Sequence, residues 1–330
     1  MDNQQFTGRH ELLDAIRRHF KEKQTRLVLW GMAGVGKTEL ARKYAYLTRQ
    51  RYPATYWISA ESQNSLERGL RKLLRPIAGE KSLVIIDGID TANDGVINCL
   101  HQGLPCCDDF DILLTTRSDS SSTLMSESLE VDCLEETEAV DLLKRLTPSR
   151  SSCTNEDETA EQIASHLGNF PLAISQCAGY INMTRTSFRD YPNDPEEFLS
   201  RTLGDSLFVQ RLNSSKKQIL STFEIIWDHL GRDDTASRDL MCLLSMFTRE
   251  IEIDMIVAGL IEHNKWFPNG KYKMARPYFV LPFLEPIAAA PHLLDEMVGI
   301  LCHLNMAKRD GNSITIHAVR WPFPWCRFNN

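Results

Sequence analysis

Residues 31–38 constrain this chain more than any other stretch, because they read Gly-Met-Ala-Gly-Val-Gly-Lys-Thr, a G-x-x-x-x-G-K-T pattern. An apolar run, Leu27–Trp30, precedes them, and the residues that follow, 39–44, suit a helix. This order of strand, glycine-rich loop and helix is typical of a phosphate-binding P-loop. The alternative is a glycine-rich turn that binds nothing, and the Lys-Thr pair after the last glycine argues against it.

The residue types in this loop suit phosphate chemistry. Glycine permits backbone conformations closed to residues with a Cβ, so the loop's N–H groups can converge on phosphate oxygens at a helix N-terminus. Lys37 adds a positive charge for β- and γ-phosphates, and the Thr38 hydroxyl offers a ligand to Mg²⁺. The predicted nucleotide-contacting residues at this loop are Met32, Ala33, Gly34, Val35, Gly36, Lys37, Thr38 and Glu39.

The first part of the chain alternates predicted strands with predicted helices. Residues 54–59 are β-branched and aromatic, and residues 83–87 and 111–117 are apolar runs of the kind that form buried parallel strands. The apolar spacing in residues 11–20 and 66–74 is helical. The pattern predicts an α/β P-loop NTPase domain, a three-layer fold with a mostly parallel sheet, over residues 1–147.

The rest of the chain reads differently. Residues 147–155 are rich in Ser, Thr and Pro, as in a linker, and residues 157–230 have helical periodicity. We expect an all-α subdomain at 148–214 and a winged-helix domain at 215–330, closed by strands at 305–308 and 313–317 around a turn at 309–312. Residues 265–291 are Pro-rich and aromatic, and their pattern predicts no element.

Three polar residues outside the loop are candidates for catalysis, together with Lys37. Asp87 ends a predicted strand, where ligands of such sheets bind, and suits a Mg²⁺ site shared with Thr38; the alternative is a turn cap. Asp90 is a candidate for orienting water, although aspartate is common in turns. Arg117 ends the next buried strand, where its guanidinium can sense a γ-phosphate, or can be an ordinary surface arginine.

Composition narrows the class of protein. The formal net charge of −7 argues against nucleic acid as the main partner. The sequence shows no secretory signal and no apolar run long enough for a membrane span. Its nine cysteines form no C-x-x-C pair. We therefore expect a cytoplasmic protein with unpaired thiols.

Taken in order, these motifs resemble the NB-ARC branch of the STAND nucleotide-switch ATPases, which includes plant resistance proteins, animal apoptotic adaptors and fungal incompatibility proteins. The resemblance covers Phe6 to about residue 320. It implies ATP or ADP as the ligand, with Mg²⁺. The segment at residues 6–9, Phe-Thr-Gly-Arg, resembles the family's adenine-contacting segment, which assigns that contact to Phe6 and Arg9.

The same resemblance assigns roles further along the chain. Thr-Thr-Arg at 115–117 resembles the family's sensor and gives Arg117 the γ-phosphate. Phe-Pro-Leu-Ala at 170–173 resembles the G-L-P-L-A motif, which places Pro171 and Leu172 at the nucleotide. His317 falls where the M-H-D histidine contacts the β-phosphate of ADP and holds the closed state. Alone, it also suits an ordinary strand histidine.

The chain departs from the family pattern at two positions. Gly88 stands where the family often has a second acid, which puts hydrolysis in doubt; no aspartate follows His317, because Ala318 is next, which puts the strength of the ADP lock in doubt. Family members usually carry an effector domain before this module and sensing repeats after it. We therefore expect a fragment, a truncated product, or an adaptor that self-associates or acts with a partner chain.

The resemblance predicts a switch in NLR-like signalling, such as innate immunity, programmed cell death or incompatibility. ADP would close the switch, exchange for ATP would open it, and hydrolysis would be slow at most. One alternative is an oligomeric ATPase that cycles continuously, which needs a competent water-orienting acid. The other is a non-enzymatic interaction module in which nucleotide is structural or lost. A small-molecule kinase fits less well, because no acceptor-binding segment is recognisable.

Overall fold

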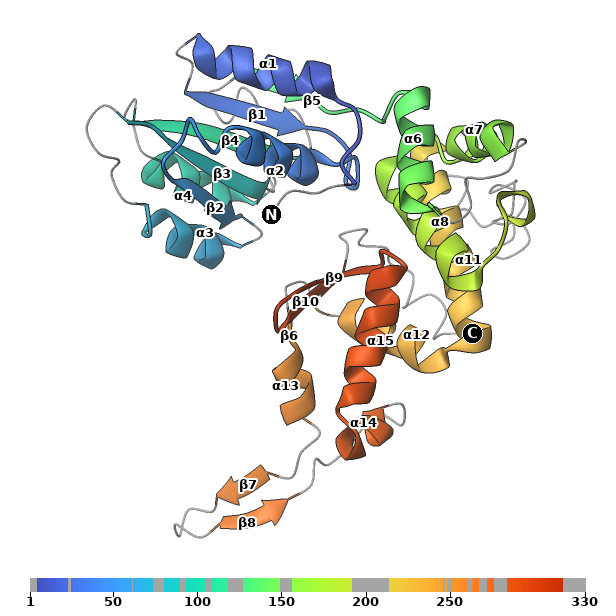
Figure 1. The fold of residues 1–330 in the computed structure, drawn as a ribbon. Coiled ribbons are helices and arrows are strands. Elements are labelled where there is room, and N and C mark those ends of the chain that lie inside the picture. The colour runs from blue at the N-terminus through green and yellow to red at the C-terminus, as the bar shows by residue number, and fades with distance from the viewer. Residues whose placement is uncertain are drawn as a thin grey trace. The chain divides into compact units, whose positions relative to one another are not determined.

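The computed structural model shows an α/β unit followed by a mainly helical unit with small antiparallel sheets (Figure 1). The first unit comprises residues 1–148 and 168–172, and the second comprises residues 149–167 and 173–330. None of the described helices is long and apolar enough to cross a bilayer. The described residues are 5–22, 25–60, 62–73, 80–89, 93–104, 109–117, 127–148, 156–191, 214–245, 247, 251–259, 263–266, 272–275 and 284–316.

The first unit is built on a five-stranded parallel sheet in the order β2-β3-β4-β1-β5. Its strands are β1 (Arg26–Trp30), β2 (Thr55–Ser59), β3 (Ser82–Ile89), β4 (Phe110–Thr116) and β5 (Glu127–Glu130). Every residue of β4 is buried, as expected for a central strand covered on both faces. The α/β P-loop fold predicted from the alternation of strands and helices is thereby confirmed.

Helices cover both faces of this sheet. On one face, apolar residues of the strands, such as Val84 and Leu114, join a buried cluster with Leu66 and Leu100 of the covering helices α3 and α4. On the other face, α1 packs on β1, and α2 packs on β3 and β4. The helices of this unit are α1 (His10–Lys21), α2 (Lys37–Leu47), α3 (Gln63–Leu70), α4 (Asp94–Gly103) and α6 (Glu136–Leu146).

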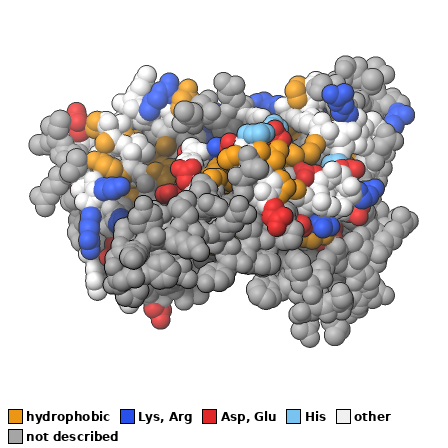
Figure 2. Space-filling view, turned by 90° about the horizontal axis from the view of Figure 1, so that it is seen from below, with side chains coloured by type: hydrophobic (Ala, Val, Ile, Leu, Met, Phe, Trp, Pro, Cys, Tyr) orange, Lys and Arg blue, Asp and Glu red, His pale blue; other side chains and the backbone are white. Residues whose placement is uncertain are grey.

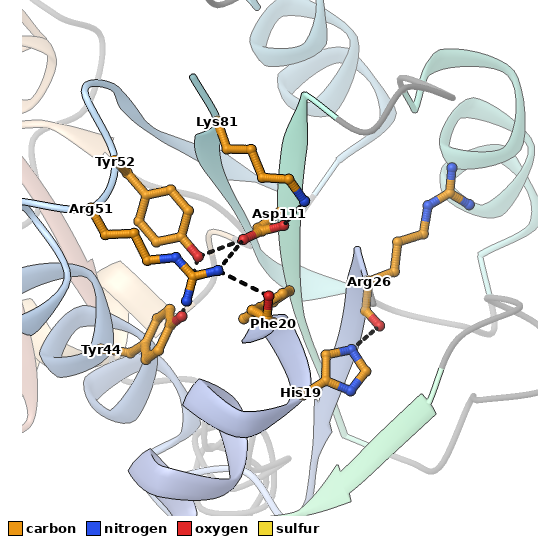
Figure 3. Close-up of polar contacts among 8 residues, drawn as sticks. All are labelled: His19, Phe20, Arg26, Tyr44, Arg51, Tyr52, Lys81 and Asp111. Atoms are coloured by element: carbon orange, nitrogen blue, oxygen red, sulfur yellow. Dashed lines mark hydrogen bonds and ion pairs between the residues drawn. The ribbon is translucent and has the colours of Figure 1, made fainter. Parts of the chain in front are cut away.

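A buried carboxylate ties β4 to its neighbours near the strand's N-terminal end (Figure 3). Asp111 is fully buried and accepts hydrogen bonds from Tyr52 Oη at 2.7 Å, Lys81 Nζ at 3.0 Å and Arg51 Nη2 at 3.4 Å. Arg51 also donates to the carbonyl of Phe20 at the end of α1 (2.9 Å). Burial and the nearby Asp111 carboxylate raise the pKa of Tyr52, which keeps its hydroxyl protonated as a donor.

The second unit contains a helical region and a small three-stranded antiparallel sheet in the order β6-β10-β9. Its core is apolar, with Leu230, Leu240, Leu294 and Leu301 fully buried. The elements assigned wholly to this unit are α7 (Glu156–His166), η1 (Phe188–Asp190), α11 (Ser214–Asp233), α12 (Thr235–Ser245), β6 (Ile251–Glu252), α13 (Ile253–Ala258), β7 (His263–Trp266), β8 (Tyr272–Ala275), α14 (Glu285–Ala289), α15 (His292–His303), β9 (Ala307–Asp310) and β10 (Ser313–Ile316). The predicted boundary between a helical and a winged-helix domain at 214/215 stays a prediction.

The closing hairpin is shifted from its predicted position. Residues 309–310, expected in the turn, lie in β9, and Asp310 pairs with Ser313. Only Gly311 and Asn312 remain in the loop, and Gly311 has φ 59°. A two-residue loop with glycine at its first central position matches the right-handed twist of the strands, which explains why the strands extend to this point. Strands β5, β6, β7 and β8 have no counterpart among the strands predicted from the sequence.

Candidate functional site

The P-loop lies at the C-terminal end of β1 and leads directly into α2. Gly34 and Gly36 have φ of 82° and 94°, in the region that favours glycine. Gly31 has φ 151°, and a Cβ there would overlap the carbonyl oxygen of Val131. The loop backbone therefore depends on glycine at each of these positions. Val35, between them, is buried.

Lys37 is the first residue of α2 and is held inside the loop. Its Nζ donates to the carbonyl oxygens of Gly31 and Met32, both at 2.7 Å. The pKa of Lys37 is lowered to about 8, mainly by burial and also by the charges of Arg117 and Arg9, whereas the Asp87 carboxylate opposes the shift. A cation in this position is destabilised without an anion, which is what a phosphate group supplies.

Asp87 connects three elements at the same end of the sheet. Its Oδ1 accepts hydrogen bonds from Thr38 Oγ1 of α2 at 2.9 Å and from Thr115 Oγ1 of β4 at 2.7 Å. The N–H of Gly88 donates to Thr115 Oγ1 at 2.9 Å, which completes the network. The predicted Mg²⁺ residues Thr38 and Asp87 are thus in direct contact, and Thr115 orients the carboxylate.

Gly88 has a structural reason to be glycine. Its φ is 80°, a conformation that an acidic residue adopts only with strain. The register between β3 and β4 also shifts between Ile86 and Ile89, at this position. The backbone here turns the Gly88 N–H toward Thr115. A second acid at position 88 would therefore be strained in this backbone.

Arg9 is a buried cation that anchors the P-loop from the start of α1. Its Nη2 donates to the carbonyl oxygens of Val35 at 2.6 Å and Asp132 at 2.8 Å, and its backbone N–H donates to Glu138 Oε1 at 2.6 Å. Burial lowers the pKa of Arg9. Nη1 has no hydrogen-bond partner among the described residues, and it is the atom closest to where a Cβ on Gly36 would stand, at 3.5 Å.

Residues 168–172 lie against the P-loop within the first unit. A Cβ on Gly34 would stand 2.8 Å from Leu172 Cδ2 and 3.0 Å from Phe170 Cε1. The carbonyl of Asn169 accepts a hydrogen bond from the N–H of Leu134 at 3.0 Å. Helix α8 (Pro171–Thr184) starts at Pro171, and its residues from Ala173 onward belong to the second unit.

The other predicted residues occupy more peripheral positions. Lys43 Nζ lies 5.8 Å from the centroid of the Phe6 ring. Glu39 pairs with Arg42 at 2.9 Å, and Ala33 is partly exposed in the loop. Arg117 is exposed just after β4 and acts on Lys37 through its charge. Two predicted residues, Asp90 and His317, lie outside the described residues.

Sequence reasoning missed several residues that shape this site. From the sequence, Thr115 is identified only as part of the Thr-Thr-Arg motif, and Gly88 only as a departure from the family pattern. Phe170 is fully buried and lies beside Gly34 of the P-loop. The motif that contains Pro171 is the sequence signal that could have indicated this position. No sequence signal indicates Glu138, which accepts a hydrogen bond from the Arg9 backbone N–H, because it is one acid among several at the start of α6.

The chain is similar in sequence to several known proteins. The family model for the AAA domain (dynein-related subfamily) matches residues 26–105. A nucleotide-binding leucine-rich repeat (NLR)-like protein of Hyaloscypha variabilis is 26% identical over 296 residues, which cover 74% of this chain and 30% of the relative. A probable disease resistance protein of Arabidopsis thaliana is 24% identical over 290 residues, covering 76% of this chain and 30% of the relative. The chain therefore spans about 30% of the length of these relatives.

The fold also resembles that of a solved structure. A STAND protein from Pyrococcus horikoshii with a tetratricopeptide repeat sensor matches with a TM-score of 0.53 at 16% identity, covering 97% of this chain and 42% of that one. In fold the chain is similar to STAND P-loop ATPases, and in sequence it is similar to NLR-like and disease resistance proteins at about 25% identity. The resemblance to STAND proteins predicted from the sequence is thereby confirmed, and a P-loop ATPase fold implies nucleotide binding.

Proposed function

We propose that this chain is the nucleotide-operated switch of an NLR-like signalling protein. In this account ADP holds a closed state, and exchange for ATP opens it. The disease resistance name of the Arabidopsis relative supports a role in defence, cell death or incompatibility. Nucleic acid is not the proposed partner: the net charge is −7, and Figure 2 shows no continuous basic patch among the residues coloured on that face.

The contact between Thr38 and Asp87 carries this proposal. A hydroxyl at the start of α2 and a carboxylate of β3 lie 2.9 Å apart beside a buried lysine at the C-terminal edge of a parallel sheet. Ligands of open α/β sheets bind at this edge. Without a ligand at this edge, the buried Lys37 ammonium would have no phosphate anion to stabilise its charge.

The donor set also suits Mg²⁺. Hydroxyl and carboxylate oxygens are the ligands that Mg²⁺ takes beside phosphate, and Thr38 Oγ1 and Asp87 Oδ1 are neighbours. When bound, the ion would neutralise charge on the phosphate oxygens. Thr115 would keep the Asp87 carboxylate in one orientation, and Lys37 would leave its carbonyl partners to meet a phosphate.

Switching requires contacts that differ between ADP and ATP, because a ligand shifts a conformational equilibrium only by its differential affinity. Arg117 follows β4 near Lys37 and is the group proposed to respond to a γ-phosphate. Pro171 and Leu172 are proposed to cover the nucleotide, since Leu172 lies against Gly34. His317 is proposed to hold the β-phosphate of ADP, as the resemblance implies.

The release rate of ADP tests this proposal. His317→Ala should release a fluorescent ADP analogue faster than the unmodified chain, measured by stopped-flow displacement. His303→Ala is the matched control, since His303 is exposed and its ring bonds to the Gly299 carbonyl of its own helix at 2.7 Å. Equal release rates for His317→Ala and the unmodified chain would contradict the lock.

A second candidate is an ATPase that cycles continuously, which the AAA-domain match at residues 26–105 favours. Gly88 argues against it, because its left-handed backbone does not suit the second acid that would orient water. Steady-state hydrolysis decides between the two. Turnover well above about one per minute would favour the cycling ATPase, whereas slower turnover favours the switch.

A further inference from the structure

The outer edge of β2 is an open strand edge. β2 ends the sheet, and among the described residues no strand pairs with its outer side. The carbonyl of Ala54 accepts from Leu83 N at 3.0 Å, and Ala60 N donates to the Asp87 carbonyl at 2.8 Å, so the even-numbered residues bond toward β3. Because backbone groups alternate along a strand, Thr55 and Trp57 direct their N–H and C=O groups outward.

This edge lacks the usual devices that block strand pairing. Natural edge strands carry lysine, proline, inward charges or bulges. The residues of β2 read Thr-Tyr-Trp-Ile-Ser, and their register with β3 runs without interruption from Thr55 to Ser59. Trp57 is 39% exposed. A partner strand would therefore meet an uncharged, regular edge with an exposed aromatic ring.

A groove runs beside this edge, between β2 and α3. It has a volume of about 350 Å³ and is lined by residues 56–59 of β2 and by Ser65, Arg68, Gly69 and Lys72. A Cβ on Gly69 would overlap the Ile58 side chain, so α3 approaches the strand closely at that point. The groove thus has a backbone edge on one side and a helix on the other.

The charges around the groove have one sign. Its two charged lining residues, Arg68 and Lys72, are both basic and exposed. Across the strand, the Arg42 guanidinium lies 5.3 Å from the centroid of the Trp57 ring. An added strand presents alternate side chains to opposite faces of the sheet. Acidic residues at every second position would therefore meet Arg68 and Lys72.

We propose that the β2 edge binds an extended, acidic segment of a partner protein as an additional strand. The backbone groups of Thr55 and Trp57 bond to the segment, and its carboxylates pair with Arg68 and Lys72. Backbone hydrogen bonds supply affinity in this mode of recognition, and alternate side chains supply specificity. The site does not involve the P-loop, so it does not depend on the nucleotide switch.

Fluorescence anisotropy with a labelled peptide tests the proposal. The probe is acetyl-Glu-Val-Glu-Val-Glu-Val-Glu-amide, and its control replaces each Glu with Lys. We expect only the acidic peptide to bind, and the double variant Arg68→Glu/Lys72→Glu to weaken its binding roughly tenfold or more. Arg71→Glu is the matched control, because Arg71 pairs with Glu67 at 3.4 Å and does not line the groove. Equal binding of both peptides, or equal weakening by Arg71→Glu, would overturn the proposal.

Amide hydrogen exchange separates strand addition from simple charge attraction. The acidic peptide should slow exchange at Thr55 and Trp57 in the unmodified chain; unchanged exchange there would overturn the proposal. Thr55→Pro removes an outward N–H but no β2–β3 bond, and proline is tolerated at strand edges, so the variant should fold. Because the outward donor is lost, the variant should not bind the acidic peptide. Lys37→Ala should bind the peptide as the unmodified chain does. Peptide binding at β2 therefore tests this proposal separately from the nucleotide switch.

Discussion

Thr115 Oγ1 donates a hydrogen bond of 2.7 Å to Asp87 Oδ1, the same oxygen that accepts from Thr38 Oγ1 at 2.9 Å. Thr115 is fully buried in β4, and its hydroxyl also accepts from the Gly88 N–H. The carboxylate is thus fixed by a neighbouring strand before any ligand arrives. Thr115 is a positioning residue for the proposed Mg²⁺ site.

Thr115→Val should weaken Mg²⁺-dependent ADP binding about tenfold, since a hydrogen bond to a charged group contributes about 1.5 kcal/mol. Titration calorimetry at several Mg²⁺ concentrations would show a higher half-saturating Mg²⁺, with little change in ADP binding without the ion. Thr116→Val is the matched control: its buried hydroxyl has no partner among the described residues, so its loss should be neutral or stabilising. Equal effects of the two variants would contradict the role of Thr115.

ADP affinity should fall as pH rises through about 8, the lowered pKa of Lys37. A bound phosphate stabilises the charged ammonium and raises this pKa, so binding takes up a proton. Affinity should drop roughly tenfold between about pH 7 and pH 9, because the neutral lysine must first be protonated. Calorimetry in buffers of different ionisation enthalpy measures the proton uptake. In Lys37→Arg, which stays charged, the dependence should disappear.

The same lowered pKa affects the stability of the unliganded protein in the opposite sense. Above about pH 8 the folded chain releases the Lys37 proton, while the unfolded chain keeps it up to the ordinary lysine range. The contribution of this group to the free energy of unfolding therefore increases as pH rises through 8. Urea denaturation of the unmodified chain and Lys37→Met across this range checks the sign.

Arg9→Lys should lower stability by about 1–3 kcal/mol, because one ammonium cannot reproduce the two bonds of Nη2 to Val35 and Asp132 with the same geometry. It should also weaken ADP binding, since the Val35 carbonyl belongs to the P-loop. Urea denaturation and calorimetry give the two values. Arg18→Lys, on the exposed surface of the same helix, serves as the control. Unchanged stability in Arg9→Lys would show that the anchor is dispensable.

Asp111→Ala should destabilise the first unit by about 3 kcal/mol while leaving ADP affinity unchanged. The substitution leaves the Tyr52 hydroxyl without its acceptor and removes the partner of Arg51 and Lys81. Asp111 lies near the N-terminal end of β4, away from the nucleotide edge. The control Asp141→Ala breaks an exposed pair with Arg145 and should cost less than about 1 kcal/mol. A matching loss of ADP affinity in Asp111→Ala would argue against this separation.

The central strands and the P-loop could be predicted from the sequence alone. β1, β3 and β4 read as continuous apolar runs because both faces of the sheet are covered, and that signal is strong. β5 reads Glu-Ser-Leu-Glu and has no such signal; its pairing with β1 makes it a strand. Edge strands of this kind depend on tertiary context more than on their own composition.

Side-chain geometry was harder to predict than the elements. Thr115 and Thr116 are adjacent and chemically alike, and the pleat sends them to opposite faces. Which one meets Asp87 depends on the register of β3 against β4, which also shifts between Ile86 and Ile89. The hairpin at residues 307–316 forms as predicted, but its turn is shorter than predicted, because Asp310 suits a turn by residue type and instead pairs with Ser313 in the strands.

The nucleotide carried by the purified protein tests the central claim most directly. The folded protein would be denatured, and the released nucleotide identified and quantified by chromatography, with Lys37→Ala prepared in parallel. The account predicts close to one ADP per chain from the unmodified protein and little from Lys37→Ala. A folded protein that releases no nucleotide and binds neither ADP nor ATP at millimolar concentration would contradict the switch, and would favour an interaction module without a nucleotide function.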